Sequence, residues 1–521
     1  MVMTDDFDPD LLRQRYRAER DRRLRSDANA QYVEIAGDFR HYVDDPYVDP
    51  GFTRVPLIDT VEVAIVGGGF GGLIAAARLR EAGAETIRII EKGGDFGGTW
   101  YWNRYPGAQC DIESYIYLPL LEETGHIPKE KYSFADEIRA HAKRIGEHYN
   151  LYELACFQTE IRELRWLEDE QLWLISTNRD DAIKARYVVM SSGPLNRPKL
   201  PGIPGIETFK GHAFHTSRWD YDYTGGSNQG GLDNLADKRV AIIGTGATAI
   251  QCVPHLGRSA KALYVFQRTP SSVDVRGNRP TDPLWAASLQ PGWQKRRMEN
   301  FNILVAGGMQ DEDLVQDGWT DIMRNLMARR PGSPLTPQQL GQEMELADFR
   351  KMNQVRARVD ATVNDPATAD ALKPWYRQFC KRPTFNDDYL PTFNRDNVTL
   401  VDTMGRGVDA VTEKGLVVDG VEYEVDCIIF ATGFEVGTAY TRRAGFEIIG
   451  RDGETLTSHW TAGLKTLHGL YSHGFPNIFH LGITQNTLTP NFPHMLDEQA
   501  SYVADVVARA KLQQARCIEP T

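Results

Sequence analysis

Paired cysteines, long apolar runs and net positive charge are all missing from this 521-residue sequence. Its six cysteines include no C-x-x-C pair, which excludes the dithiol motif of disulfide reductases and the usual paired zinc ligands. Unpaired thiols indicate a reducing, cytoplasmic location. The net charge of −12 argues against a nucleic-acid partner, because binding to the phosphate backbone requires clustered Lys and Arg.

Neither membrane insertion nor secretion is expected. The most apolar stretch, residues 63–77, is too short to cross a bilayer and contains five glycines. The chain begins MVMTDDFDPD, with acids where a secretory signal carries positive charge. Residues 1–55 are highly charged and predict a solvated extension with one helix, capped by Asp8 or Asp10.

A glycine fingerprint follows the β-branched run at residues 61–66. Gly67, Gly69 and Gly72 match G-x-G-x-x-G and precede an Ala- and Leu-rich helical pattern. The first glycine permits a tight turn, the second admits a pyrophosphate, and the third lets helix and strand pack closely. Glu91 ends the next strand-like run, where an acid binds ribose hydroxyls and repels a 2′-phosphate. This unit therefore predicts FAD or NAD and not NADP.

A second fingerprint begins at Gly244 and continues with Gly246 and Ala249. The strand-like run after it ends in Arg268 and Thr269, which replace the acid of the first unit. A cation and a hydroxyl at this position favour a 2′-phosphate, so NADPH is predicted here. An ordinary surface charge is the alternative interpretation of Arg268.

The two β-α-β units predict an α/β fold with two Rossmann-like dinucleotide-binding domains, for FAD and NADP, and a helical insertion. The expected boundaries are an N-terminal extension at 1–55, a discontinuous FAD-binding domain at 56–200 and 390–521, an NADP-binding domain at 201–275 and 371–389, and the helical insertion at 276–370. Hydride would pass from NADPH to the flavin. Without a cysteine pair, oxygen or a quinone-like carrier remains as the acceptor.

One motif between the fingerprints carries a family resemblance. The stretch FKGHAFHTSRWD fits F-x-G-x-x-x-H-x-x-x-W-D, with Phe209, Gly211, His215, Trp219 and Asp220 at the specified positions. Taken alone, its four-residue spacing would suggest one packed helix face. Because this motif lies between two dinucleotide motifs, residues 60–500 resemble the Baeyer–Villiger monooxygenases. The role expected for His215 and Trp219 is structural, in linking the domains.

Other segments are similar to the same family. They are residues 97–115 on the flavin side, residues 380–402 near the nicotinamide, and FATGF at 430–434. Residues 481–500 and the N-terminal extension resemble the cyclopentadecanone and steroid monooxygenase branch. Members of that branch continue past Thr521 into a loop with a Trp that reaches the nicotinamide, so retention of NADP⁺ is expected to differ here.

The resemblance implies an NADPH- and O2-dependent flavoprotein that inserts one oxygen next to a ketone carbonyl, through a C4a-peroxyflavin, to give an ester or lactone. The branch implies bulky or cyclic ketones. Arg382 would stabilise the anionic peroxide, because a guanidinium keeps its charge, and Asp111 would hold it. Lys381 would bind the 2′-phosphate with Arg268 and Thr269.

The fingerprints and the resemblance together imply a set of cofactor-binding residues. They are Gly67, Gly69, Phe70, Gly72, Glu91, Gly98, Thr99, Trp100 and Asp111 on the FAD side, and Gly244, Thr245, Gly246, Ala247, Thr248, Gln251, Arg268, Thr269 and Lys381 on the NADP side. Two alternatives stay open: a flavin-dependent N- or S-hydroxylating monooxygenase, and an impaired, NADPH oxidase-like nucleotide-binding protein.

Overall fold

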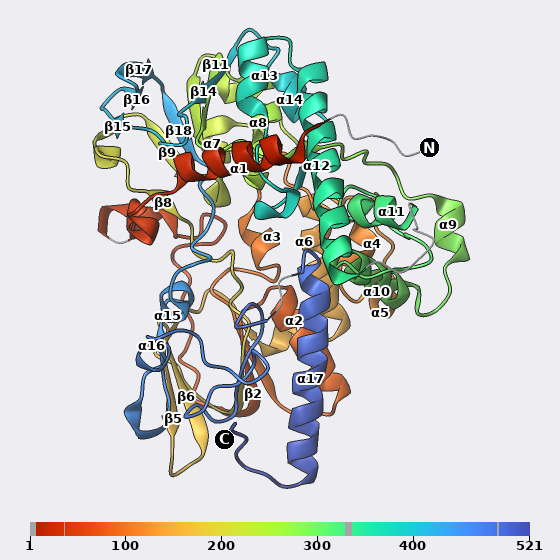
Figure 1. The fold of residues 1–521 in the computed structure, drawn as a ribbon. Helices are drawn as coiled ribbons and strands as arrows, with labels where there is room; N and C mark the ends of the chain where they lie inside the picture. The colour runs from red at the N-terminus through yellow and green to blue at the C-terminus, as the bar shows by residue number, and fades with distance from the viewer. Residues whose placement is uncertain (1–6, 36, 329–335, 487–488) are drawn as a thin grey trace.

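The first glycine turn belongs to an eight-stranded sheet in the lower half of Figure 1. The computed structural model describes residues 7–35, 37–328, 336–486 and 489–521. The strand order of this sheet is β19 (Glu447–Ile449), β5 (Ile161–Leu167), β6 (Leu172–Thr177), β7 (Ala182–Met190), β2 (Thr60–Val66), β3 (Ile87–Ile90) and β4 (Ala155–Cys156), with β20 (Ile478–His480) paired to the end of β7. Strand β2 pairs in parallel with β3 and β7, β3 with β4, and β20 with β7, whereas β6 is antiparallel to β5 and β7.

The second glycine turn belongs to a five-stranded parallel sheet in the upper half of Figure 1. Its order is β14 (Val398–Asp402), β11 (Ala262–Gln267), β10 (Arg239–Ile243), β18 (Cys427–Phe430) and β9 (His212–His215). The central strands are buried on both faces, which explains why they read as continuous apolar runs. The chain thus forms two α/β units of the dinucleotide-binding type, as the fold class predicted.

The second sheet differs from the expected boundary at residue 390. Strands β14 and β18 come after that boundary, where the sequence analysis expected the FAD-binding domain, but they pair with β11 and β10. Between β14 and β18 lies a small antiparallel sheet of β15 (Ala410–Val411), β16 (Gly415–Val418) and β17 (Val421–Glu424). The chain therefore returns to the first unit after β18.

Helices cover both units. In the first, α2 (Phe70–Glu81) packs against α17 (Phe492–Leu512), with Arg78 Nε 2.7 Å from Asp497 Oδ1. In the second, α8 (Ala247–Ser259) follows the glycine turn. The remaining helices outside the insertion are α3 (Thr99–Trp102), α4 (Ser114–Tyr117), α5 (Leu121–Thr124), α6 (Ala135–His148), α7 (Tyr221–Thr224), α14 (Tyr389–Thr392), α15 (Tyr440–Ala444) and α16 (Leu456–His459).

Most of the insertion lies on the right of Figure 1, and helices make up most of its described part. It contains α9 (Pro283–Ser288), α10 (Trp293–Val305), α11 (Asp321–Ala328), α12 (Pro337–Thr362) and α13 (Pro366–Leu372). Strands β12 (Val273–Asp274) and β13 (Thr384–Phe385) pair in parallel at its base. A buried Lys351 on α12 binds both Asp274 and Asp321, which ties the insertion to the second unit.

The N-terminal extension begins with α1 (Pro9–Arg23), which crosses the face of the second unit (Figure 1). Asp8 caps this helix, because its Oδ1 accepts the Asp10 amide at 2.8 Å, so one of the two predicted caps is confirmed. Arg13 of α1 binds Glu345 of α12 at 2.6 Å. The 3-10 helix η1 (Ala28–Gln31) and β1 (Tyr32–Val33) follow, and β1 pairs with β8 (Leu200–Pro201).

Two expected absences can be compared with the described residues. Within that part of the chain, no helix has the length and apolar character that crossing a bilayer requires. The same residues contain no group of three or more His, Cys, Asp or Glu side chains placed to hold a metal ion.

Candidate active site

The two glycine turns have nearly the same backbone geometry. Gly67 has φ of 108° and Gly244 has φ of 112°, a region that side chains disfavour. A Cβ on Gly67 would lie 2.4 Å from the Ser191 carbonyl oxygen, and one on Gly244 would lie 2.5 Å from that of Ala431. Each turn therefore requires glycine for its conformation and for its close approach to a neighbouring strand.

The two units differ at the third position of the glycine fingerprint. A Cβ on Gly72 would come within 1.9 Å of the Gly67 carbonyl oxygen, so α2 packs directly on its turn. The buried Ala249 takes this place in the second unit, where the helix has room for a methyl group. Both helices start at a glycine, Gly69 or Gly246, that makes no side-chain cap. Their first amides remain available for an anion.

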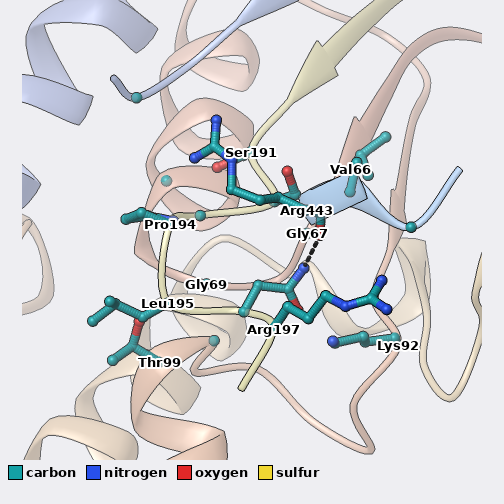
Figure 2. Close-up of a pocket in the computed structure, with 18 of the residues that line it drawn as sticks. Val66, Gly67, Gly69, Lys92, Thr99, Ser191, Pro194, Leu195, Arg197 and Arg443 are labelled. Atoms are coloured by element: carbon teal, nitrogen blue, oxygen red, sulfur yellow. Dashed lines mark hydrogen bonds between the residues drawn. The ribbon is translucent and has the colours of Figure 1, made fainter. Parts of the chain in front are cut away.

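A cavity of about 600 Å³ opens at the first turn. Predicted residues that line it are Gly67, Gly69, Phe70, Glu91, Gly98, Thr99 and Trp100. Figure 2 shows Thr99 and Leu195 together at one end, with Lys92 and Arg197 at the other. We call the side of the cavity at Thr99 and Leu195 its apolar end; Lys92 and Arg197 lie on the opposite side, an arrangement that suits a flavin ring joined to phosphates.

Glu91 lies inside this cavity with both carboxylate oxygens engaged. Its Oε2 accepts the Gly68 amide and its Oε1 accepts the Gly93 amide, each at 2.6 Å. Burial raises the pKa of Glu91, although the two amides oppose the shift. Burial, with the nearby Arg218, lowers the pKa of Lys92 to about 8. The acid that the sequence assigned to the ribose is thus present in the cavity and oriented by the glycine turn.

A second cavity, of about 1240 Å³, opens at the turn of α8. Predicted residues that line it are Asp111, Gly244, Thr245, Gly246, Ala247, Thr248, Gln251, Arg268, Thr269, Lys381 and Arg382. The two cavities share one wall, formed by Thr99, Trp100, Tyr117, Pro194, Leu195, Ile483 and Phe492. A ring in the apolar end of the first cavity would therefore face the second.

Arg382 and Asp111 form a two-point ion pair in the second cavity. Arg382 Nε lies 2.7 Å and Nη2 lies 2.6 Å from the two carboxylate oxygens. Burial opposes ionisation of Asp111, but the guanidinium outweighs it and the pKa lies below its usual value. The Arg382 side chain is 46% exposed and that of Asp111 16%. The acid thus holds the cation while leaving half of it open to the cavity.

Trp319 supports this pair from the helical insertion. Its indole Nε1 donates to the Asp111 carbonyl oxygen at 2.7 Å, and its ring centre lies 5.2 Å from the Arg382 guanidinium carbon. A cation over an aromatic face is stabilised by the ring quadrupole. Trp319 could not be predicted from the sequence, because nothing in the polar, helix-like stretch around it signals a contact with residues so far away in the chain.

Lys381 lies beside the strand end that carries Arg268 and Thr269. Its Nζ donates to the Thr269 carbonyl oxygen at 3.3 Å and to Ser271 Oγ at 3.2 Å. Burial, with the nearby Arg23 and Arg268, lowers the pKa of Lys381 to about 8. This corner of the cavity has an excess of positive charge, which an anion would neutralise.

Gln251 is placed differently from the other predicted residues. Its Oε1 accepts the Tyr105 hydroxyl at 2.9 Å, and its Nε2 donates to the Gln109 carbonyl oxygen at 2.8 Å. These contacts join α8 to a loop of the first unit. Gly72 lies behind its turn, against Gly67. Their direct binding of cofactor therefore stays a prediction.

The motif that carries the resemblance is not one face of a helix. His215 ends β9, a 3-10 turn follows, and both His215 and Trp219 are buried. Nε2 of His215 donates to the Gly433 carbonyl oxygen at 3.1 Å, while burial lowers its pKa to about 3. Arg218 between them donates to the Asp44 carbonyl oxygen and stacks on Trp102. The motif thus joins the second unit to the extension and the first unit, and its histidine stays neutral.

Comparison with known proteins identifies the family. A family profile described as pyridine nucleotide-disulphide oxidoreductase matches residues 61–281. Baeyer-Villiger monooxygenase ATR8 of Stachybotrys chlorohalonatus is 52% identical over 99% of this chain and 83% of its own. The chain belongs to the Baeyer–Villiger monooxygenases. Neopentalenolactone D synthase of Streptomyces avermitilis is 55% identical over 98% of this chain and 87% of its own.

Two solved structures have a similar fold. The polycyclic ketone monooxygenase of Thermothelomyces thermophila has a TM-score of 0.90 at 42% identity, over 97% of this chain and 85% of its own. OTEMO, solved as a complex with FAD and NADP, has a TM-score of 0.74 at 29% identity, over 90% and 88%. The interpretation of the chain as a flavoprotein monooxygenase of this family is confirmed, and the N- or S-hydroxylating alternative is not supported. All six cysteines are free, so the dithiol of the profile's name has no counterpart here.

Proposed function

We propose that this Baeyer–Villiger monooxygenase binds FAD in the first cavity and NADPH in the second, and oxygenates bulky or cyclic ketones there to esters or lactones. The observation that carries the proposal is the Arg382–Asp111 pair, which lines the second cavity near Tyr117 of the shared wall. A permanent cation at that place can stabilise an oxyanion. The free thiols support a reducing, cytoplasmic setting.

The lining of the first cavity supports FAD as its occupant. The open amides of α2 would bind the pyrophosphate, and Glu91 would accept the ribose hydroxyls. Trp100 and Tyr117 of the shared wall, joined by a 2.9 Å hydrogen bond, would pack beside the flavin ring. Bound flavin supplies electron storage and oxygen activation, and the chain supplies its position.

The second cavity fits NADPH together with a ketone. The open amides of α8 would bind the pyrophosphate, and Arg268, Thr269 and Lys381 would bind the 2′-phosphate. Arg382 would hold negative charge at the reacting oxygen, with Asp111 fixing its fork. Relatives named for a polycyclic ketone and for neopentalenolactone D suggest a bulky ketone. The cavity is large enough, and its apolar side chains include Leu195, Ile203, Val408, Phe434 and Phe492.

Three measurements on the purified protein test this function. We expect a yellow protein with FAD released on denaturation, NADPH consumption that increases with a polycyclic ketone, and a product heavier by one oxygen that comes from ¹⁸O2. NADPH consumption without an oxygenated product, over a panel from small rings to steroids, would contradict the proposal.

Removal of the Lys381 ammonium is expected to lower the preference for NADPH. Lys381→Ala should raise the KM for NADPH at least about tenfold and leave that for NADH nearly unchanged, because only NADPH carries the 2′-phosphate. Steady-state kinetics with both cofactors measures this. Equal changes for both cofactors would remove Lys381 from the phosphate site.

The same group predicts a pH dependence. Lys381 loses its proton as pH rises through about 8, so NADPH affinity should fall as the pH rises above that value. NADH affinity should not follow this profile, and Lys381→Ala should flatten the profile for NADPH. A profile for NADPH that is flat in the unsubstituted protein would contradict the assignment.

A further inference from the structure

The segment that follows α1, residues 25–32, is fixed to the link between the two units. Strand β1 pairs with β8, and the Gln31 carbonyl oxygen accepts the Gly202 amide at 2.8 Å. The Lys199 ammonium lies 4.2 Å from the centre of the Tyr32 ring. This part of the N-terminal extension is therefore held in place and is more than a solvated helix on the body.

Three side chains of this segment line the second cavity: Arg25, Gln31 and Tyr32. The Oε1 atom of Gln31 accepts Nη1 of Arg268 at 2.7 Å, so the amide orients the guanidinium assigned to the 2′-phosphate. Nη1 of Arg25 donates to the Arg406 carbonyl oxygen at 3.1 Å, and Arg406 also lines the cavity. The segment therefore supplies both a cation and a positioning amide to one corner.

Charge at this corner is unbalanced. Two acids face it. Asp27 pairs with Arg25, whose Nε lies 2.9 Å away, and Asp409 accepts the Asp419 amide at 2.7 Å. The cations nearby are Arg23, Arg25, Arg268, Lys381 and Arg406. In the described part of the chain Arg268 and Lys381 form no ion pair, so a bound dianion would gain more beside these two cations than a neutral group would.

We infer that residues 25–32 complete the binding site for the adenosine 2′-phosphate of NADPH. Gln31 holds the Arg268 guanidinium toward that phosphate, and Arg25 presents a second guanidinium to the same anion. The inference rests on the proposed placement of the phosphate at Arg268 and Lys381. The N-terminal extension then contributes to the choice of NADPH over NADH.

Calorimetric titration of the full-length, flavin-loaded protein with 2′,5′-ADP and 5′-AMP tests the inference, because the two ligands differ only in the 2′-phosphate. We expect Arg25→Ala and Gln31→Ala each to weaken 2′,5′-ADP about tenfold, equal to about 1.4 kcal/mol, and to leave 5′-AMP unchanged. The KM for NADPH should rise by the same factor with little change in kcat, and the KM for NADH should stay constant.

Arg20→Ala is the matched control within the same extension. Arg20 pairs with its neighbour Asp21, at 2.6 Å, and its side chain is 64% exposed. This variant should bind both ligands normally. Equal losses for 2′,5′-ADP and 5′-AMP in the Arg25 and Gln31 variants, with a lowered Tm, would indicate a structural role only and overturn the inference.

Lys381→Ala tests the placement of the 2′-phosphate, on which the inference rests, separately from the role of residues 25–32. If Lys381→Ala loses discrimination between the two ligands while Arg25→Ala and Gln31→Ala keep it, the phosphate site stands and the segment has no part in it. If all three variants keep discrimination, the phosphate is bound elsewhere and both assignments fail.

Discussion

Arg382→Ala is expected to retain its flavin and to oxidise NADPH, but to lose about a thousandfold in ester formation. The guanidinium is the fixed cation in the second cavity that Asp111 orients, and an alanine leaves negative charge at the reacting oxygen without a partner. Flavin absorbance, NADPH consumption, hydrogen peroxide and ester are measured on the same preparation. Hydrogen peroxide should take the place of the ester.

Two further variants show which property of Arg382 matters. Arg382→Lys keeps a cation but loses the planar fork, so we expect partial activity. Asp111→Asn removes the opposing charge and leaves an amide in place, and the guanidinium should then lose its fixed orientation. Unchanged ester formation by Arg382→Ala would remove this residue from the chemistry.

Gly72→Ala is expected to give protein without flavin. The added Cβ would come within 1.9 Å of the Gly67 carbonyl oxygen, a backbone atom, so the helix or the turn would have to shift. Overpacking of this kind costs about 1–3 kcal/mol or more. It would displace the turn that approaches the pyrophosphate. Flavin content of the purified protein and its Tm measure the effect, and circular dichroism establishes whether the chain is folded.

The matched control is the same substitution in the first turns of α12. Among the described residues, none places an atom within 4 Å of the position that a Cβ on Gly341 would take, so the methyl group of Gly341→Ala meets open space there. We expect full flavin content and a gain of up to about 1 kcal/mol from helix propensity. Full flavin content and an unchanged Tm in Gly72→Ala would show that α2 can move away from its turn.

Much of the fold could be predicted because its signals are local. A β-branched run, a glycine turn and an apolar helix lie within about two dozen residues, and the same holds for the second unit. The partner of a parallel strand has no such local signal. Strands β14 and β18 therefore could not be assigned to a sheet from their own residues, which explains the difference at residue 390.

Less of the candidate site could be predicted from short stretches of sequence. Arg382 and Asp111 are 271 residues apart, so only the family resemblance brought them together. Trp319 lies in a stretch whose polar pattern predicts only a helical insertion. Arg25 and Gln31 lie in a charged extension, and a charged run looks the same whether it is solvated or faces a ligand. Contacts of this kind depend on tertiary structure.

The wall shared by the two cavities has a consequence for altering substrate range. Leu195, Ile483 and Phe492 border both cavities, so a substitution there that widens the proposed ketone site would also widen the cavity in which we propose that the flavin binds. Val408 and Val436 border the second cavity alone. Mutant libraries directed at such positions should change selectivity for the ketone while the flavin stays bound. Libraries directed at the shared wall should change selectivity only at the cost of flavin binding.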